Sequence, residues 1–153
     1  MDLILWRHAQ AEPESELVPD LERALTSKGE RQAQRMARWL NHRLAQSTRI
    51  LVSPALRCQQ TAKALERGFR TLPMLAPEAP AADLLQAARW PDCAESVLVI
   101  GHQPALGQLA ARLLSGADQT WPIKKGAVWW LRHRVQEGLL ETSLIAVQSV
   151  DML

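Results

Sequence analysis

Four basic side chains follow short apolar runs of the 153-residue chain: Arg7, His8, Arg57 and His102. The apolar runs cover residues 3–6, 50–52 and 97–100. A guanidinium offers paired donors that match phosphate oxygens, and a neutral imidazole is a competent nucleophile near pH 7. Two guanidiniums beside two imidazoles are therefore typical of a site that binds and transfers a phosphoryl group.

Each of these residues also has an ordinary structural interpretation when it is taken alone. Arg7-His8 is compatible with a solvated strand end, and Arg57 with a surface arginine whose aliphatic stem lies along a helix. Their joint placement is harder to explain in this way. If the three apolar runs are neighbouring parallel strands, all four side chains converge at one edge of the sheet, where open α/β folds bind ligands.

The apolar runs themselves indicate strands that are buried on both faces. None of them alternates with polar residues, which is typical of parallel strands covered by helices. Amphipathic helical patterns lie between and after these runs, near residues 27–45, 54–67, 81–90 and 104–115. The order of strands and helices therefore predicts an α/β sheet.

Capping residues predict where two of these helices begin. Thr26 or Ser27 is a natural N-cap of the first helix. Ser53 is expected to cap the second helix, with Pro54 at its first position. Arg57 then lies in the first turn of that helix, where free backbone N–H groups and the helix dipole favour anions.

The end of the chain predicts an antiparallel hairpin, because strand-like segments at 127–135 and 139–148 flank a turn at 136–138. The proline-rich segment 73–80 is expected to be an exposed connection. The chain length suits one domain. We therefore predict a single α/β domain over residues 1–153, with a central, mostly parallel sheet flanked by helices and a C-terminal antiparallel hairpin.

Composition excludes several classes of function. The formal net charge is +2 and acidic residues are interleaved with basic ones, which does not indicate a nucleic-acid surface. No apolar run approaches the ~20 residues needed to span a bilayer, and the first residues lack the pattern of a signal peptide. We expect a cytoplasmic protein with no nucleic-acid or membrane partner, and nothing in the sequence requires more than a monomer.

The sequence predicts neither a metal nor a cofactor. It contains no P-loop and no carboxylate cluster arranged for Mg²⁺. The two cysteines, Cys58 and Cys93, are far apart and lack the spacing of zinc ligands, so we expect free thiols in a reducing compartment. A metal-free, covalent route through a phosphohistidine fits these absences.

Four short motifs together resemble the histidine phosphatase superfamily, which has the phosphoglycerate-mutase-like fold. In chain order they are Arg7-His8, Leu25-Thr26-Ser27-Lys28-Gly29, Ser53-Pro54-x-x-Arg57-x-x-Gln60-Thr61-Ala62 and Gly101-His102. The small size and the lack of insertions are most similar to the SixA-type phosphohistidine phosphatase branch. The chain departs from the superfamily's Arg-His-Gly motif at Ala9, a small replacement that also occurs in this branch.

The resemblance implies a role for each of the four basic residues. His8 would be the nucleophile that becomes phosphorylated. Arg7 and Arg57 would clamp the phosphoryl oxygens, and His102 would complete the pocket as a donor to the same group. Gln10 would border the site.

A missing acid points to the substrate class. Many members of the superfamily carry a carboxylate after the second motif's helix, whereas this chain has Met74 at the matching position. Glu78 and Asp83 come later and are interpreted as surface residues. An alkoxide leaving group depends on protonation more than imidazole does. We therefore predict a phosphatase that acts on phosphohistidine in a protein, with a pocket that no lid covers.

Two alternatives remain open at this stage. One is a phosphatase for small phosphate esters that uses Glu78 as its acid. The other is a non-catalytic phosphate-binding module that has kept the pocket. Trp90, Trp121 and the Lys124-Lys125 pair are candidates for the mouth of the pocket.

Overall fold

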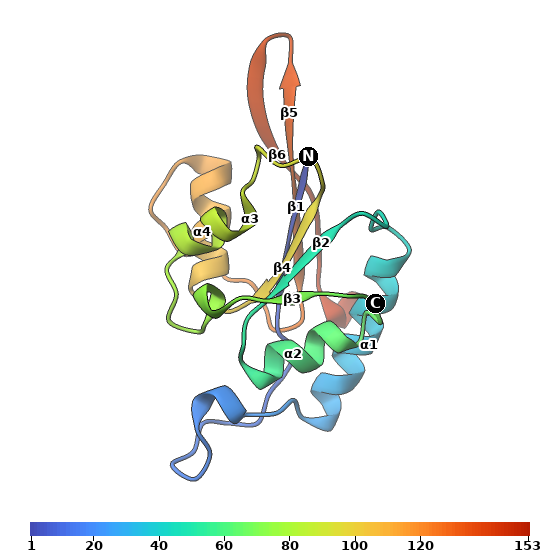
Figure 1. The fold of residues 1–153 in the computed structure, drawn as a ribbon, viewed down its shortest axis with the longest axis vertical. Coiled ribbons are helices and arrows are strands. Elements are labelled where there is room, and N and C mark those ends of the chain that lie inside the picture. The colour runs from blue at the N-terminus through green and yellow to red at the C-terminus, as the bar shows by residue number, and fades with distance from the viewer.

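The computed structural model describes residues 1–153, and a six-stranded mixed sheet forms its centre (Figure 1). The strands are β1 (Asp2–Arg7), β2 (Arg49–Val52), β3 (Arg70–Thr71), β4 (Val97–Gly101), β5 (Val128–Gln136) and β6 (Leu139–Gln148). The helices are α1 (Ser27–Asn41), α2 (Leu56–Lys63), α3 (Ala81–Ala88) and α4 (Ala105–Ser115). Short 3₁₀ turns are η1 (Asp20–Glu22), η2 (Pro73–Leu75) and η3 (Val150–Met152).

The strands follow the order β3-β2-β4-β1-β5-β6 across the sheet. The first four of these run parallel to one another, whereas β5 is antiparallel to β1, and β6 to β5. This confirms the predicted parallel sheet with an antiparallel C-terminal hairpin. The register sets Arg7 beside Gly101 and Val52 beside Ile100, so β1, β4 and β2 end at the same edge.

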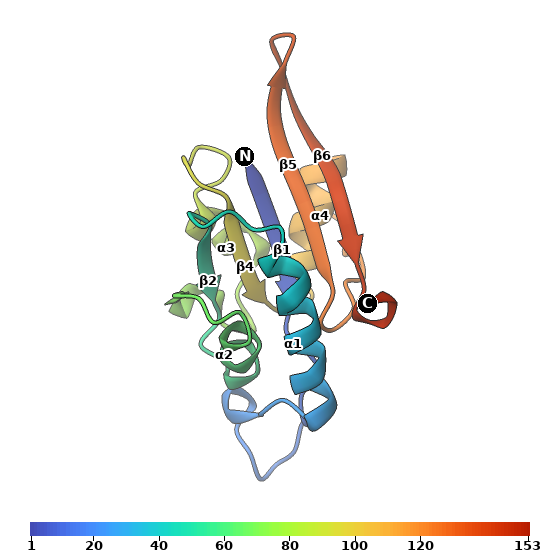
Figure 2. The same cartoon turned by 90° about the vertical axis from the view of Figure 1, so that its right-hand side faces the viewer.

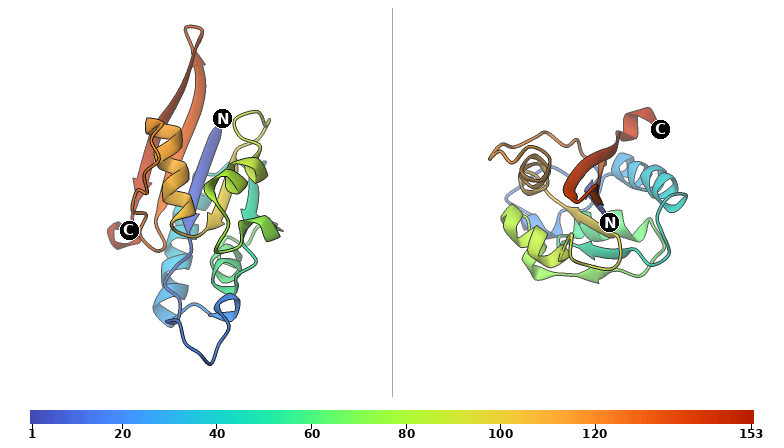
Figure 3. Two further views of the ribbon diagram at one scale, coloured as in Figure 1. Left: turned by 90° about the vertical axis from the view of Figure 1, so that its left-hand side faces the viewer. Right: turned by 90° about the horizontal axis from the view of Figure 1, so that it is seen from above.

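Helices cover both faces of the sheet, with α1 and α2 on one face and α3 and α4 on the other (Figures 2 and 3). Successive side chains of a strand point to opposite faces. Ile4 and Trp6 of β1 therefore join the core under α1 and α2, while Leu3 and Leu5 join the core under α3 and α4. Burial on both faces explains why this strand reads as a continuous apolar run.

Two peripheral segments lie at opposite ends of the molecule. The loop of residues 12–24, which contains η1, lies at the end of the sheet where β1 finishes, and the β5–β6 hairpin projects from the other end (Figures 1 and 2). Asp2 pairs with Arg132, so β5 continues four residues beyond the start of β1. Glu137 and Gly138 close the hairpin with φ values of 52° and 78°, the left-handed conformation that tight hairpin turns require.

The start of α2 differs from the prediction. The N-cap is Ala55, so α2 begins at Leu56, and the prediction that Ser53 caps it with Pro54 at the first position is wrong. Ser53 Oγ accepts a hydrogen bond from the Ala55 amide at 3.2 Å and contacts His102 Nε2 at 2.8 Å. The Ser53 side chain therefore hydrogen-bonds to His102, which follows β4, and does not cap α2.

Two further predictions differ from the structure, the end of α1 and the exposure of the segment 73–80. α1 ends at Asn41 rather than near residue 45, although Leu44 is still buried. The segment 73–80 is not simply an exposed connection, because it forms η2 and buries Leu75 in the core beneath α3 and α4. No helix combines the length and the apolar character needed to cross a membrane.

Candidate active site

The four basic residues predicted from the sequence line one cavity, at the edge where the parallel strands end. Arg7 is the last residue of β1 and His8 follows it, Arg57 lies in the first turn of α2, and His102 follows β4. The cavity has a volume of about 700 Å³. The centroids of the His8 and His102 rings are 5.3 Å apart. Three distant segments of the chain therefore present their basic groups to one space.

His8 is held as a neutral imidazole with one nitrogen engaged. Its ring is 6% exposed, and burial lowers its pKa to about 4, helped by the positive charges of Arg57, Arg7 and Lys125. Nδ1 lies 2.8 Å from the carbonyl oxygen of Ala9, which can only accept, so Nδ1 carries the proton. Nε2 is therefore left with a free lone pair, as a nucleophile requires.

The backbone after His8 is fixed by side chains from α1 and α2. The amide of Ala9 donates to Thr61 Oγ1 at 3.1 Å, and the amide of Gln10 donates to Gln32 Oε1 at 3.0 Å. Thr61 in turn donates to the carbonyl of Arg57 at 2.7 Å. One side chain of the Gln60-Thr61-Ala62 motif thus links the loop that follows His8 to the helix that carries Arg57.

The Leu-Thr-x-x-Gly motif brings the start of α1 against the same loop. Thr26 caps α1 by accepting from the Gly29 amide at 2.9 Å, and its own amide donates to the carbonyl of Gln10 at 3.1 Å. A Cβ at Gly29 would lie 1.9 Å from that carbonyl oxygen. Only glycine therefore allows the helix to approach the loop this closely.

Arg57 is buried and is anchored by a residue that the sequence did not suggest. Its side chain is 4% exposed, Nη1 donates to the carbonyl of Asp20 at 2.8 Å, and Nη2 donates to Asp20 Oδ2 at 3.1 Å. Burial alone would raise the pKa of Asp20, but hydrogen bonds from Arg23 and Arg57 outweigh it and hold the pKa below its usual value. Asp20 is thus an ionised carboxylate inside the cavity.

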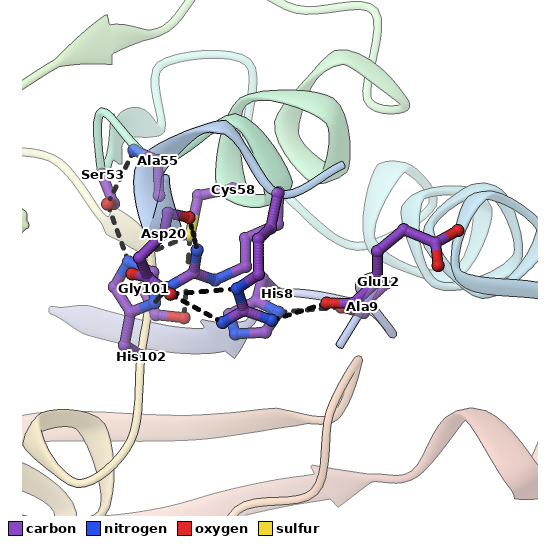
Figure 4. A network of polar contacts seen from close by, with 11 residues as sticks. His8, Ala9, Glu12, Asp20, Ser53, Ala55, Cys58, Gly101 and His102 are labelled. Atoms are coloured by element: carbon purple, nitrogen blue, oxygen red, sulfur yellow. Dashed lines mark hydrogen bonds and ion pairs between the residues drawn. The ribbon is translucent and has the colours of Figure 1, made fainter. Parts of the chain in front are cut away.

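His102 bridges Arg57 and Ser53. Arg57 Nη2 lies 3.4 Å from His102 Nδ1, and because a guanidinium can only donate, Nδ1 accepts. Nε2 then donates to Ser53 Oγ at 2.8 Å (Figure 4). Burial and the adjacent His8 and Arg57 lower the pKa of His102 to about 3. The Ser53 hydroxyl can donate as well as accept, so the other tautomer of His102 becomes available only where Arg57 no longer donates to Nδ1.

Arg7 is positioned by the backbone of residues 123–127, which precede β5. Its Nη1 donates to the carbonyl of Ile123 at 2.8 Å, and its amide donates to the carbonyl of Ala127 at 3.1 Å. The amide of Gly126 donates to the carbonyls of Arg7 and His8. The segment before β5 therefore holds the arginine at the cavity.

Several lining residues were not predicted, and some candidates lie elsewhere. Four basic and two acidic side chains line the cavity: Arg7, Arg23, Arg57, Lys125, Glu14 and Asp20. Of the candidates for the mouth, Lys125 lines the cavity, whereas Trp90 donates to the Met1 carbonyl at the opposite end of β1. Asp20 is 37 residues from Arg57 in a loop without periodicity, so no sequence signal could have paired them.

The two carboxylates considered as acids do not line the cavity. Glu78 is exposed, and its neighbour Pro77 is the residue of that segment that reaches the lining. Asp83 lies on α3, and Met74 packs against the core. Cys58 is buried near His102, and burial raises the pKa of its thiol to about 12, which keeps it protonated.

The sequence model of the histidine phosphatase superfamily (branch 1) matches residues 3–79, which include Arg7, His8 and Arg57. The chain belongs to this superfamily. It is 33% identical to an uncharacterized protein of Picosynechococcus sp., over 86% of this chain and 85% of the other. It is 32% identical to the phosphohistidine phosphatase SixA of Escherichia coli K12, over 76% of each chain.

The fold supports the same family assignment. A solved structure of the protein histidine phosphatase SixA complexed with tungstate superposes with a TM-score of 0.78 and 26% identity, covering 99% of both chains. The chain is therefore a phosphatase enzyme of the histidine phosphatase superfamily with a SixA-like fold. The resemblance inferred from the four motifs is confirmed.

Proposed function

We propose that this phosphatase removes the phosphoryl group from phosphohistidine in a protein, through a covalent intermediate on His8 and without a metal ion. The observation that carries the proposal is the neutral His8 ring, whose Nδ1 is tied to the Ala9 carbonyl while Nε2 is free. Arg7, Arg57 and His102 share the cavity with it. A nucleophile beside fixed positive charges is what phosphoryl transfer needs.

In the first step His8 Nε2 attacks phosphorus in line with the bond that breaks. A P–N bond forms to His8, the P–N bond of the substrate breaks, and its electron pair goes to the departing ring nitrogen. A proton on the other nitrogen of the substrate ring lets it leave as neutral imidazole. Arg7 and Arg57 hold the phosphoryl oxygens. When Arg57 turns from His102 Nδ1 to those oxygens, His102 can take its other tautomer, in which the Ser53 hydroxyl donates to Nε2 and Nδ1 carries the proton and donates to the phosphoryl group.

In the second step water attacks phosphorus, and the electron pair of the P–N bond returns to His8 Nε2. The Ala9 carbonyl keeps the other proton on Nδ1, so His8 also leaves as a neutral imidazole. Inorganic phosphate is released and the resting ring is restored. Both steps therefore use the same ring geometry and require no movement of His8.

Metal independence is supported by the charges of the site. Four basic side chains line the cavity and can neutralise the phosphoryl oxygens. Of the two carboxylates there, Asp20 is already paired with Arg57 and Arg23. No group of three His, Cys, Asp or Glu side chains is close enough to hold an ion.

The choice of phosphohistidine is supported by a relative and by the cavity. The Escherichia coli relative is a phosphohistidine phosphatase. Asp20, which contacts Arg57, is held ionised and is a poor proton donor at neutral pH. We further propose that residues 1–153 act as one domain, as a cytoplasmic monomer whose partner is a phosphoprotein rather than nucleic acid or a membrane.

Turnover on three substrates tests the proposed function. A synthetic peptide with one phosphohistidine is compared with p-nitrophenyl phosphate and with a sugar phosphate. We expect kcat/KM for the peptide to exceed that for the sugar phosphate by roughly 10²-fold or more, because the cavity supplies no strong acid to protonate an alkoxide leaving group. The p-nitrophenolate of the other ester leaves without a proton, so that ester reports phosphoryl transfer alone. His8→Ala should abolish all three activities. Strong ester turnover that collapses in Glu78→Gln would overturn the proposal, as would binding without any turnover.

A further inference from the structure

A protein substrate must touch the rim of the cavity. His8 is only 6% exposed, so a phosphohistidine whose phosphorus reaches Nε2 brings its flanking residues against the cavity mouth. On one side that mouth is formed by the loop of residues 12–24, because Pro13, Glu14, Asp20 and Arg23 line the cavity. This loop is therefore placed to contact the residues around a phosphohistidine.

The loop exposes three apolar side chains. Leu17 is 92% exposed, Leu21 48% and Val18 42%. Val18 lines a small hollow of about 210 Å³, which shares Glu14, Asp20 and Arg23 with the main cavity. Exposed apolar groups clustered beside a binding site mark a contact surface for another protein.

The same loop is strongly acidic. It carries five carboxylates against one arginine, and Asp20 and Arg23 pair with each other. The four remaining carboxylates form no ion pair: Glu12, Glu14, Glu16 and Glu22. A partner with basic residues next to its phosphohistidine would be attracted to this surface, and a partner with acidic residues would be repelled.

We infer, on the basis of the proposed function, that the loop 12–24 is the docking surface for the phosphoprotein. It selects substrates that carry leucine-like and basic residues beside the phosphohistidine. The hairpin tip offers a useful contrast, since Leu139 and Leu140 are 72% and 73% exposed at the opposite end of the sheet from the cavity (Figure 1). Apolar side chains are exposed both in the loop 12–24 and at the hairpin tip, but of the two only the loop lines the active-site cavity.

Three synthetic peptides test the inference. Each carries one phosphohistidine, flanked by leucine and lysine, by leucine and glutamate, or by serine alone. We expect kcat/KM to be about 10-fold higher for the leucine–lysine peptide than for the other two, the size of effect that a few exposed contacts supply. Free phosphohistidine is assayed in parallel, because it reports the chemistry without docking.

Two loop variants and one control locate the effect. Leu17→Ser with Leu21→Ser should remove most of the preference for leucine, and Glu16→Gln with Glu22→Gln should remove the preference for lysine. Neither pair lines the cavity, so turnover of free phosphohistidine should be unchanged in both. Leu139→Ser with Leu140→Ser is the matched control and should change nothing.

Other outcomes separate this inference from the proposed function. Equal kcat/KM on all three peptides, or a loss only in the hairpin control, would overturn the docking surface and leave the phosphohistidine activity intact. A dimer that Leu17→Ser with Leu21→Ser converts to monomer, with peptide kinetics unchanged, would assign the surface to a second copy and also overturn it. Hydrolysis of p-nitrophenyl phosphate without hydrolysis of any peptide would instead contradict the proposed function.

Discussion

The protonation state of His8 follows from two simple features, its burial and one backbone hydrogen bond. Burial and nearby guanidiniums disfavour the charged ring, which lowers the pKa to about 4. The Ala9 carbonyl then decides which nitrogen keeps the proton of the neutral form. A buried histidine after a strand would ordinarily be only a structural residue, and here the free lone pair on Nε2 is what the proposed role as nucleophile requires.

The pKa of His8 provides the first prediction. The neutral form is the proposed nucleophile, so protonation of His8 should lower kcat/KM only as the pH drops through about 4, and not between pH 6.5 and 5. Titration of the ring carbons by NMR checks the pKa directly. A midpoint for His8 near 6.5 would contradict this view of the site.

Asp20 provides the second prediction. Its carboxylate competes with a phosphoryl group for Arg57 Nη2, at 3.1 Å, and its side chain is 45% exposed. Exposed or half-exposed ion pairs contribute ~1 kcal/mol or less, so Asp20→Asn should tighten the binding of inorganic phosphate by about 3- to 5-fold. Isothermal titration calorimetry measures the change.

A matched control for this variant is Asp118→Asn. Asp118 pairs with Arg112 at 3.4 Å outside the active-site cavity. Its replacement should leave the affinity for phosphate unchanged. If Asp20→Asn weakens phosphate binding, the carboxylate is not a competitor for Arg57 but a support for it.

The residues that form the site, and the contacts that position them, come from the ends of strands and helices. The first turn of α1 contacts the Gln10 carbonyl, the first turn of α2 supplies Arg57, and the last residue of β1 supplies Arg7. The sequence predicted the end of β1 and the start of α1 because the apolar run and the helical periodicity are strong, but it placed the start of α2 two residues too early. It did not predict η1 or the two-residue β3, which are too short to leave a periodic pattern.

Gly29 provides a prediction about the contact between α1 and the loop that follows His8. In Gly29→Ala the new methyl group would meet the Gln10 carbonyl, and backbone cannot yield as a flexible side chain does. We expect a loss of about 1–3 kcal/mol in the free energy of unfolding, together with a lower kcat because the loop carries His8. Chemical denaturation and steady-state kinetics measure the two effects.

Gly68→Ala is the control for this substitution. A Cβ at Gly68 would meet nothing within 4 Å, and no positive φ is required there. Stability and kcat should both stay near those of the parent protein. An equal loss in both variants would show that the effect does not come from the contact with Gln10.

The molecule as a whole builds its site by bringing together the ends of parallel strands. The sequence predicted this convergence from three apolar runs, since parallel neighbours must end at one edge. It could not predict that Asp20 would complete the cavity, because Asp20 reaches Arg57 only through tertiary packing and lies in no motif. Lys125 was a candidate for the mouth, and it lines the cavity.

The two buried histidines provide a prediction about global stability. In the unfolded chain His8 and His102 take up protons near pH 6.5, whereas the folded protein holds them neutral down to about pH 4 and 3. The unfolded state therefore binds more protons below pH 6.5. The free energy of unfolding should fall as the pH drops from 6.5 to 4, by up to about 1.4 kcal/mol per pH unit for each histidine.

Denaturation in urea at a series of pH values measures this slope. The double variant His8→Gln with His102→Gln should lose most of it between pH 6.5 and 4.5, where the ordinary titration of carboxylates contributes little. A slope that is unchanged in the double variant would mean that these histidines are not held neutral in the folded state.

The covalent role of His8 is tested most directly by trapping the intermediate. The enzyme is mixed with a ³²P-labelled phosphohistidine peptide, quenched in alkali within milliseconds to seconds, digested and analysed by mass spectrometry. The expected result is an acid-labile, alkali-stable phosphoryl group on the peptide that contains His8, absent in His8→Ala. Turnover by His8→Ala equal to that of the parent, or label on another residue, would contradict the proposed mechanism.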